Sequence, residues 1–116
     1  MSAYTLAYEP IWILRTAFKK NRSRIWKDLE NRLMTSRSNR TEVNISKLAN
    51  FTKDGEIVAI PGKLLGSGSI GHRVTVYALS ISEQAATKIT QAGGRFISLD
   101  DLIRKYPEGK GVRIIG

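Results

Sequence analysis

Cysteine is absent from the sequence, and histidine occurs once, at position 72. Disulfides, thiolate metal ligands and cysteine nucleophiles are therefore excluded, and a usual zinc site cannot be built from one histidine. No apolar run approaches the roughly 18 residues that a membrane-spanning helix needs. The first residues carry an acid and a proline and lack the basic segment of a secretory signal. We therefore expect a soluble, intracellular protein that uses no metal or organic cofactor.

Acidic residues are also scarce. The chain has 10 Asp and Glu against 19 Lys and Arg, so its formal net charge is +9 over 116 residues. Nine of the basic residues but only two of the acids fall within residues 15–40. A basic block of this kind favours a polyanionic partner, with nucleic acid as the first candidate and an anionic membrane as the second. The plain alternative is a solvated helix surface.

The N-terminal third is predicted to form two helices. Pro10 is typical of the first position of a helix, and apolar residues at helical spacing follow it. Ser23 can cap the second helix. Trp12 and Trp26 fall among the apolar positions, so we expect both rings in the core rather than stacked on nucleotide bases. Residues 35–42 show no periodicity, and they form either a linker or a segment that becomes ordered on a phosphate backbone.

The remainder alternates short strands with short helices. The expected strands cover residues 56–60, 73–81, 95–99 and 111–115. The expected helices cover residues 45–51, 81–92 and 99–106. Pro61-Gly62 should end the first of these strands, and Ser80-x-x-Glu83 has the pattern of a capping box. The fold class is therefore α/β, a compact unit of irregular strand-strand-helix turns preceded by a helical pair and a basic segment. We expect a division into residues 1–42 and 43–116.

A glycine-rich stretch, "GKLLGSGSIGHR", covers residues 62–73. Its Gly66-x-Gly68-x-x-Gly71 spacing matches a dinucleotide-binding fingerprint, but that fingerprint needs a helix directly after the loop, and a strand is expected here. A phosphate-binding P-loop would need Gly-Lys-Ser/Thr at the end of the loop, which is missing. His72 has no partner set typical of catalysis, so we expect no enzymatic activity. The stretch is either a loop that lies against phosphates or a flexible connection between strands.

Four segments carry a resemblance to a known family. They are "VNISKLANF", "GEIVAIPGKLLGSGSI", "VTVYALSISEQAATKITQAGGRFISLDDL" and "PEGKGVRII", and together they cover about residues 43–115. In this order they resemble the archaeal and eukaryotic large-subunit ribosomal protein eighteen-e family, which is similar in fold to bacterial large-subunit protein fifteen. The N-terminal third matches more loosely, and Tyr8-Glu9-Pro10 departs from the family's Asn-Pro opening. The resemblance implies a structural constituent of the large ribosomal subunit that binds ribosomal RNA beside neighbouring ribosomal proteins, with no membrane and no small-molecule substrate.

The resemblance also implies where RNA is contacted. The family's contacts fall on the Arg-rich segment and the glycine loop, which correspond here to Arg37, Arg40, Lys63, Gly66, Ser67 and Gly68. Charge and proximity to that loop add His72 and Arg73. Composition alone adds Arg22, Arg24, Arg95, Lys110 and Arg113. Three alternatives stay open: a general RNA-binding or RNA-chaperone protein outside the ribosome, an amphipathic membrane-surface binder through residues 10–34, and a small enzyme that uses His72.

The Arg-rich segment yields a prediction from the sequence alone. Replacing Arg37 or Arg40 by alanine removes one phosphate contact, so the slope of log affinity for ribosomal RNA against log salt should fall by about one unit. A salt titration of each single variant measures this slope. An Arg37→Ala plus Arg40→Ala protein whose affinity and slope both match the parent chain would exclude a role of the segment in binding.

Overall fold

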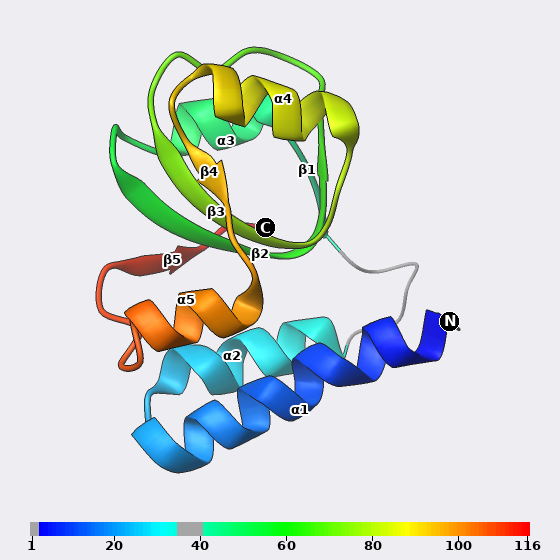
Figure 1. Ribbon diagram of the computed structural model, residues 1–116, viewed down its shortest axis with the longest axis vertical. Coiled ribbons are helices and arrows are strands. Elements are labelled where there is room, and N and C mark those ends of the chain that lie inside the picture. Colours follow the sequence, from blue (N-terminus) through cyan, green and yellow to red (C-terminus); the bar gives the residue numbers. More distant parts are fainter. Residues whose placement is uncertain (1–2, 35–40) are drawn as a thin grey trace.

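The computed structural model describes residues 3–34 and 41–116 (Figure 1). Its elements in chain order are α1 (Ala3–Asn21), α2 (Arg24–Leu33), β1 (Thr41–Asn44), α3 (Ile45–Phe51), β2 (Glu56–Leu65), β3 (Val74–Ile81), α4 (Glu83–Gln91), β4 (Arg95–Phe96), α5 (Leu99–Lys105) and β5 (Val112–Ile114). The α/β class predicted from the sequence is confirmed, as is the helical pair at the start. Arg37 and Arg40 lie outside the described residues.

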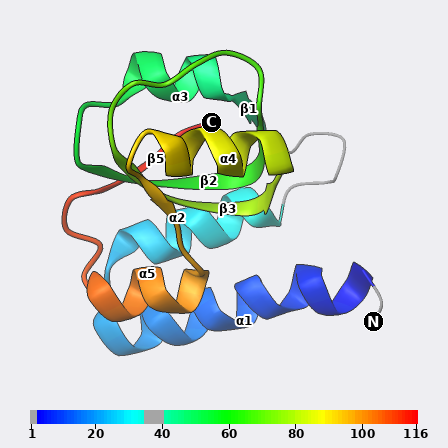
Figure 2. The same cartoon turned by 45° about the horizontal axis from the view of Figure 1, so that its top comes forward.

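The strands form one parallel sheet with β2 at its centre. The order is β1-β2-β3-β4, and β5 also pairs with β2. Strand β5 pairs with residues 57–59 of β2, whereas β1 pairs with residues 62–65, so both share one edge of the central strand. A parallel sheet is stable in water only when both faces are covered. Helices α3 and α4 cover one face, and α1, α2 and α5 cover the other (Figure 2).

Alternation along the central strands supplies both halves of the core. Val58 and Ile60 of β2 point to the α3–α4 side, and Ala59 between them points to the α1–α2–α5 side. Tyr77 of β3 also faces the α1–α2–α5 side and is buried. Side chains at successive strand positions point to opposite faces, so strands buried on both sides read as continuous apolar runs. Since α1 and α2 pack on this sheet, the N-terminal helices and the rest of the chain share one core.

The tryptophans of the two N-terminal helices have different surroundings. Trp26 is fully buried, and its indole Nε1 donates to the Pro107 carbonyl at 2.8 Å, so the core prediction is confirmed for this ring. For Trp12 the prediction is wrong, because 69% of its surface is exposed. Helix α1 buries the stripe of Leu14 and Ala17, and a residue two positions before Leu14 projects from nearly the opposite side of a helix.

The start of α1 also differs from the prediction. The helix begins at Ala3, and Pro10 lies inside it. The predicted start of α1 was too late because proline is favoured in the first turn of a helix. A proline without an N–H removes a single intrahelical hydrogen bond, and here the helix continues on both sides of it.

The end of β2 predicted from Pro61-Gly62 is wrong. Strand β2 does not end at Pro61-Gly62 but runs on to Leu65, with a shift of register against β3 between Ile60 and Lys63. Such an irregularity accommodates a residue that has no N–H to donate. Gly62 is required there, because a Cβ at this position would lie 1.9 Å from the Thr41 carbonyl oxygen of β1.

The cap of α4 is Ser82 rather than Ser80. The Ser82 hydroxyl accepts from the Ala85 N–H at 3.1 Å, whereas Ser80 still belongs to β3. The sheet register therefore decided between two serines that local sequence could not separate. Ser98 caps α5, and its hydroxyl accepts from the Asp101 N–H at 3.1 Å. Strand β4 contains only Arg95 and Phe96 and is shorter than predicted.

The burial of Tyr77 predicts how stability changes at alkaline pH. Burial raises the pKa of this phenol from 10.0 to about 12, so the neutral form is favoured in the folded chain. The corresponding stabilisation is complete below pH 10 and is lost as the pH rises toward 12. We expect Tyr77→Phe to avoid a loss of about 2 kcal/mol over that interval. Urea unfolding of both proteins at matched alkaline pH measures the difference, and parallel curves for the two would contradict the prediction.

Candidate nucleic-acid interface

The glycine stretch crosses one face of the sheet. Residues 66–73 connect the end of β2 to the start of β3, and these two strands are parallel, so the chain must return along the whole strand. This connection contains no helix and passes by α3 and α4 (Figure 2). A strand follows the glycines, as predicted, so the geometry of a dinucleotide or P-loop site is missing.

Close approach to the protein's own helices explains two of these glycines. A Cβ at position 66 would lie 2.6 Å from the Gln84 side chain of α4, and one at 68 would lie 2.5 Å from Ser46 of α3. Gly68 also has a φ of +103°, which side-chain-bearing residues rarely adopt. Lys88 of α4 donates to the carbonyls of both glycines. The segment is therefore fastened to the body, with Ser67 and Gly68 exposed on its surface.

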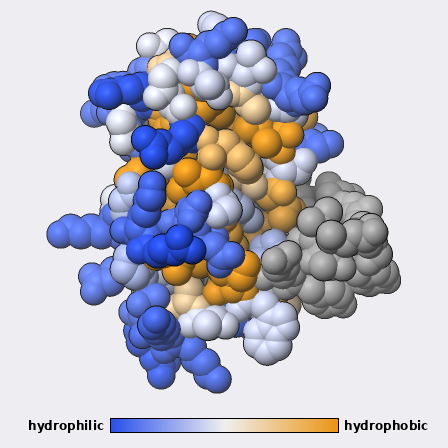
Figure 3. Space-filling view, in the orientation of Figure 1, coloured by the Kyte–Doolittle hydropathy of each residue, from blue (hydrophilic) through white to orange (hydrophobic). Residues whose placement is uncertain are grey.

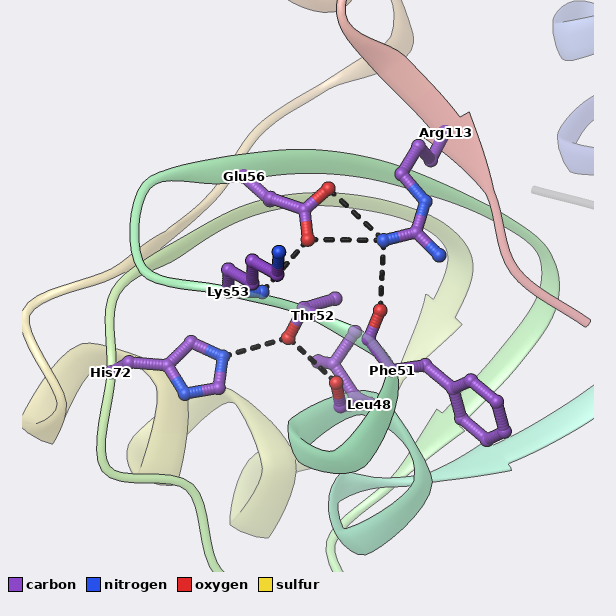
Figure 4. Close-up of polar contacts among 7 residues, drawn as sticks. All are labelled: Leu48, Phe51, Thr52, Lys53, Glu56, His72 and Arg113. Carbon is purple, nitrogen blue, oxygen red and sulfur yellow. Dashed lines mark hydrogen bonds and ion pairs between the residues drawn. The ribbon is translucent and has the colours of Figure 1, made fainter.

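His72 ties the end of this segment to α3 (Figure 4). Its Nε2 lies 2.7 Å from the Thr52 hydroxyl, and that hydroxyl donates to the Leu48 carbonyl at 2.6 Å. Because the hydroxyl proton is already used, the imidazole must be the donor to the Thr52 oxygen. The histidine therefore serves as a structural donor in this contact, and nothing in the arrangement activates a nucleophile.

Arg73 and Arg113 are both paired with carboxylates. Arg73 contacts Asp54 through its Nε at 3.1 Å and its Nη2 at 2.8 Å. These side-chain bonds, with a further one from the Arg73 N–H, hold the pKa of Asp54 well below its usual range. Arg113 donates to Glu56 at 3.0 Å and to the Phe51 carbonyl at 2.8 Å (Figure 4). The bond from Arg113 lowers the pKa of Glu56, as does the Lys53 N–H.

The other predicted cations are unpaired within the described residues. Arg22, Arg24, Lys63, Arg95 and Lys110 make no side-chain hydrogen bond or ion pair there. All five are exposed to solvent. They differ in this respect from Arg73 and Arg113, and their charge is free to neutralise an external anion.

Several of these cations gather at the turn between α1 and α2. The Ser23 hydroxyl donates to the Glu108 carbonyl at 2.7 Å, which brings the loop containing Lys110 beside Arg24. In Figure 3 hydrophilic side chains gather at the lower left, where Figure 1 places the α1–α2 turn. We call this surface the turn patch, and it comprises Lys19, Lys20, Arg22, Arg24, Lys27 and Lys110. Lys63 on β2 and Arg95 on β4 lie on other elements.

Arg22 holds an unusual backbone conformation within the turn patch. Its φ is +58°, and it is the one residue other than glycine with a positive φ in the described part of the chain. Its N–H donates to the Phe18 carbonyl at 2.8 Å and closes α1, a position that glycine normally occupies. The left-handed conformation ends α1 and directs the chain into α2, with the Arg22 side chain exposed to solvent.

Metal binding and membrane association were also considered for the described residues. Within residues 3–34 and 41–116, no three His, Asp or Glu side chains cluster as metal ligands would. No helix of that part is both long and apolar enough to cross a membrane. The apolar stripe of the N-terminal helices, which a membrane-surface binder would have to expose, is buried at Leu14, Leu29 and Leu33.

The known proteins that this chain resembles are large-subunit ribosomal proteins. The model of a family described as ribosomal protein 60S L18 and 50S L18e matches residues 13–116. The large ribosomal subunit protein eL18 of Archaeoglobus fulgidus is 44% identical over 103 residues, which is 89% of this chain and 88% of that protein. Its counterpart from Methanospirillum hungatei is 43% identical over 107 residues, or 92% and 88% of the two chains. The one from Pyrobaculum aerophilum is 40% identical over 102 residues, or 88% and 84%.

The glycine segment allows a test of its packing. Gly68→Ala combines a positive φ with a collision against Ser46, so we expect it to lower the free energy of unfolding by about 3 kcal/mol. Gly71→Ala is the matched control, because a Cβ there meets nothing within 4 Å, and its effect should stay within about 0.5 kcal/mol. Denaturant unfolding measures both. Equal stabilities of the two variants would mean that the segment does not pack against α3.

Proposed function

This chain belongs to the family of ribosomal protein 60S L18 and 50S L18e, and we propose that it is a structural constituent of the large ribosomal subunit. In this proposal it binds folded ribosomal RNA, lies beside neighbouring ribosomal proteins in the cytoplasmic ribosome, and has no enzymatic activity. The observation that carries the proposal is the family match over residues 13–116, which covers α1 from Ile13 onward, all of α2 and the whole sheet.

The proposed mechanism is neutralisation of phosphates by a rigid body. Unpaired cations on the turn patch displace counterions from the RNA backbone, and the release of these counterions favours binding. The turn patch is held in shape by a buried contact, since Trp26 of α2 is bonded to the carbonyl of Pro107, which lies in the same loop as Lys110. Contacts with phosphate and sugar fix the orientation of RNA helices without reading base sequence, which suits recognition of RNA shape.

The glycine segment is proposed as a second contact surface. Ser67 and Gly68 are exposed there, and Lys63 lies nearby in sequence at the end of β2 with an unpaired ammonium group. Gly66 is buried and bonded through its carbonyl to Lys88, so in this proposal it positions the segment. Backbone groups and hydroxyls of such a segment can bond phosphate or ribose oxygens.

The paired arginines have a different proposed role. Arg73 and Arg113, with His72 between the glycine segment and α3, hold together the loops before β2 and β3. Their carboxylate partners cancel most of their charge, so each should contribute less to phosphate binding than Arg24 or Lys110 does. Arg95 on β4 stays a proposed contact by its exposure and lack of a partner.

We propose that residues 1–42 and residues 43–116 supply different RNA contact surfaces. Residues 1–42 supply most of the turn patch and the Arg-rich segment, and residues 43–116 supply the glycine segment with Lys63. The two parts share one core, so the proposal treats them as two contact surfaces of one body.

An alternative function is RNA binding outside the ribosome. The deciding experiment is co-sedimentation of the protein with large subunits at high salt, beside a salt titration against ribosomal RNA and an unrelated folded RNA of equal length. A preference for ribosomal RNA that persists at high salt supports the ribosomal role. Equal affinity for both RNAs, lost together as salt rises, would leave a general basic RNA-binding protein.

The pairing of cations predicts which substitutions weaken RNA binding. With about six phosphates contacted, log affinity should fall with log salt at a slope of roughly −4 to −5. Arg24→Gln plus Lys110→Gln removes two unpaired charges, so the slope should become shallower by about 1.5 units. The matched control is Asp54→Asn plus Arg73→Gln, which removes an internal pair and leaves the net charge unchanged. If the control lowered the slope as much as the first variant, charge on the turn patch would not determine binding.

A further inference from the structure

An exposed tryptophan borders a groove between α1 and α5. Trp12 is 69% exposed, and the groove beside it has a volume of about 750 Å³. Its apolar lining comes from Ile13 and Ala17 of α1, Ile103 of α5 and Pro107. This volume lies within the range of sites that hold small organic molecules, which are typically lined by apolar groups with a few polar ones.

The exposure of Trp12 has no explanation in the folding of the chain. The buried stripe of α1 is formed by Leu14 and Ala17, and the indole lies outside it. Met34, Phe51 and Phe96 are also exposed, but none of them lines this groove. A large aromatic ring left in solvent beside an apolar groove is typical of a binding surface.

Charge around the groove favours an anionic occupant. Lys20 of the turn patch and Arg104 of α5 both line it. Lys20 makes no ion pair among the described residues. Arg104 pairs with Asp101 on its own helix at 3.4 Å, a longer contact than the 2.8 Å and 3.0 Å pairs of Arg73 and Arg113, and 77% of its side chain is exposed. The groove lining contains one carboxylate, Asp100, so its two cations leave an excess of positive charge. Since Lys20 belongs to both surfaces, the groove continues the turn patch, where phosphates are proposed to lie.

Polar groups at the groove also suit the edge of a base. Asn21 and Thr16 can donate and accept hydrogen bonds, and the Asp100 carboxylate can accept from an exocyclic amino group. An unpaired nucleotide presents a flat apolar ring, polar edges and a phosphate, and RNA-binding proteins commonly recognise such nucleotides by stacking them on aromatic side chains.

We propose that the α1–α5 groove holds an unpaired RNA nucleotide, with its base stacked on Trp12 and its flanking phosphates against Lys20 and Arg104. This proposal rests on the proposed RNA-binding function and adds a preference for unpaired over fully paired RNA. A neighbouring protein's apolar side chain is the competing occupant. The two cations at the groove and its continuity with the turn patch favour the polyanion.

The test uses two ring-modified variants and two RNAs. Trp12→Leu keeps apolar bulk without a flat ring, and Trp12→Phe keeps an aromatic ring as the matched control. Poly(U) supplies unpaired bases, and the poly(A)·poly(U) duplex supplies the same backbone with every base paired. We expect Trp12→Leu to weaken poly(U) binding about tenfold at constant salt slope, Trp12→Phe to weaken it less, and neither to change duplex binding. Poly(U) should also quench the fluorescence of Trp12, whereas Trp26 is buried.

The outcomes separate this proposal from the ribosomal one. Unchanged poly(U) binding in Trp12→Leu, or equal losses on both RNAs, overturns the nucleotide site even if co-sedimentation with large subunits persists. Weaker co-sedimentation of Trp12→Leu without any change in poly(U) binding also overturns it, and would assign the groove to a neighbouring protein. Selective loss on poly(U) together with quenching supports the site. That result would support the nucleotide site even if the chain did not co-sediment with large subunits. In that case only the ribosomal assignment would be wrong.

Discussion

Strand β2 pairs with β1, β3 and β5, and this pairing requires helices on both faces of the sheet. A strand paired along both edges and parallel to all its neighbours is hidden from water on both faces, so helices must cover it above and below. Residues 57–60 meet this demand with an unbroken apolar run whose side chains alternate between the two layers. Strands β5 and β1 occupy the same edge of β2 one after the other, at residues 57–59 and 62–65.

The same constraint produces the two surfaces that are proposed to contact RNA. Because β2 and β3 are parallel neighbours, the chain between them must return across the sheet, and it does so as an irregular glycine-rich segment rather than a helix. That segment is clamped by α3 and α4, so its exposed residues are presented by a rigid body. On the opposite layer, the α1–α2 turn and the loop before β5 meet through Ser23 and Glu108. Cations that are far apart in sequence thereby share one surface.

Ion pairs between residues distant in the sequence determine where unpaired charge remains. Acidic residues are few, and two of them, Asp54 and Glu56, form ion pairs with Arg73 and Arg113 at the loops around β2. Glu30 is buried between α1 and α2, where its Oε2 lies 2.9 Å from the Nε of Arg15. The surplus positive charge is consequently concentrated on side chains without partners. This separation of structural from unpaired cations needs the coordinates, because composition counts both kinds alike.

The α/β class, the helical pair, most strands and helices, the strand after the glycine loop and the family could all be predicted from the sequence, because they follow from local periodicity, glycine and cap chemistry, and motif order. Tertiary structure alone decided that β2 continues through Pro61, that Ser82 rather than Ser80 caps α4, and that Trp12 faces solvent while Trp26 is buried. It also decided which arginines are already paired. Each of these outcomes depends on a partner distant in the chain, such as Thr41 for Gly62 or Asp54 for Arg73, and local sequence carries no record of which distant atoms will meet.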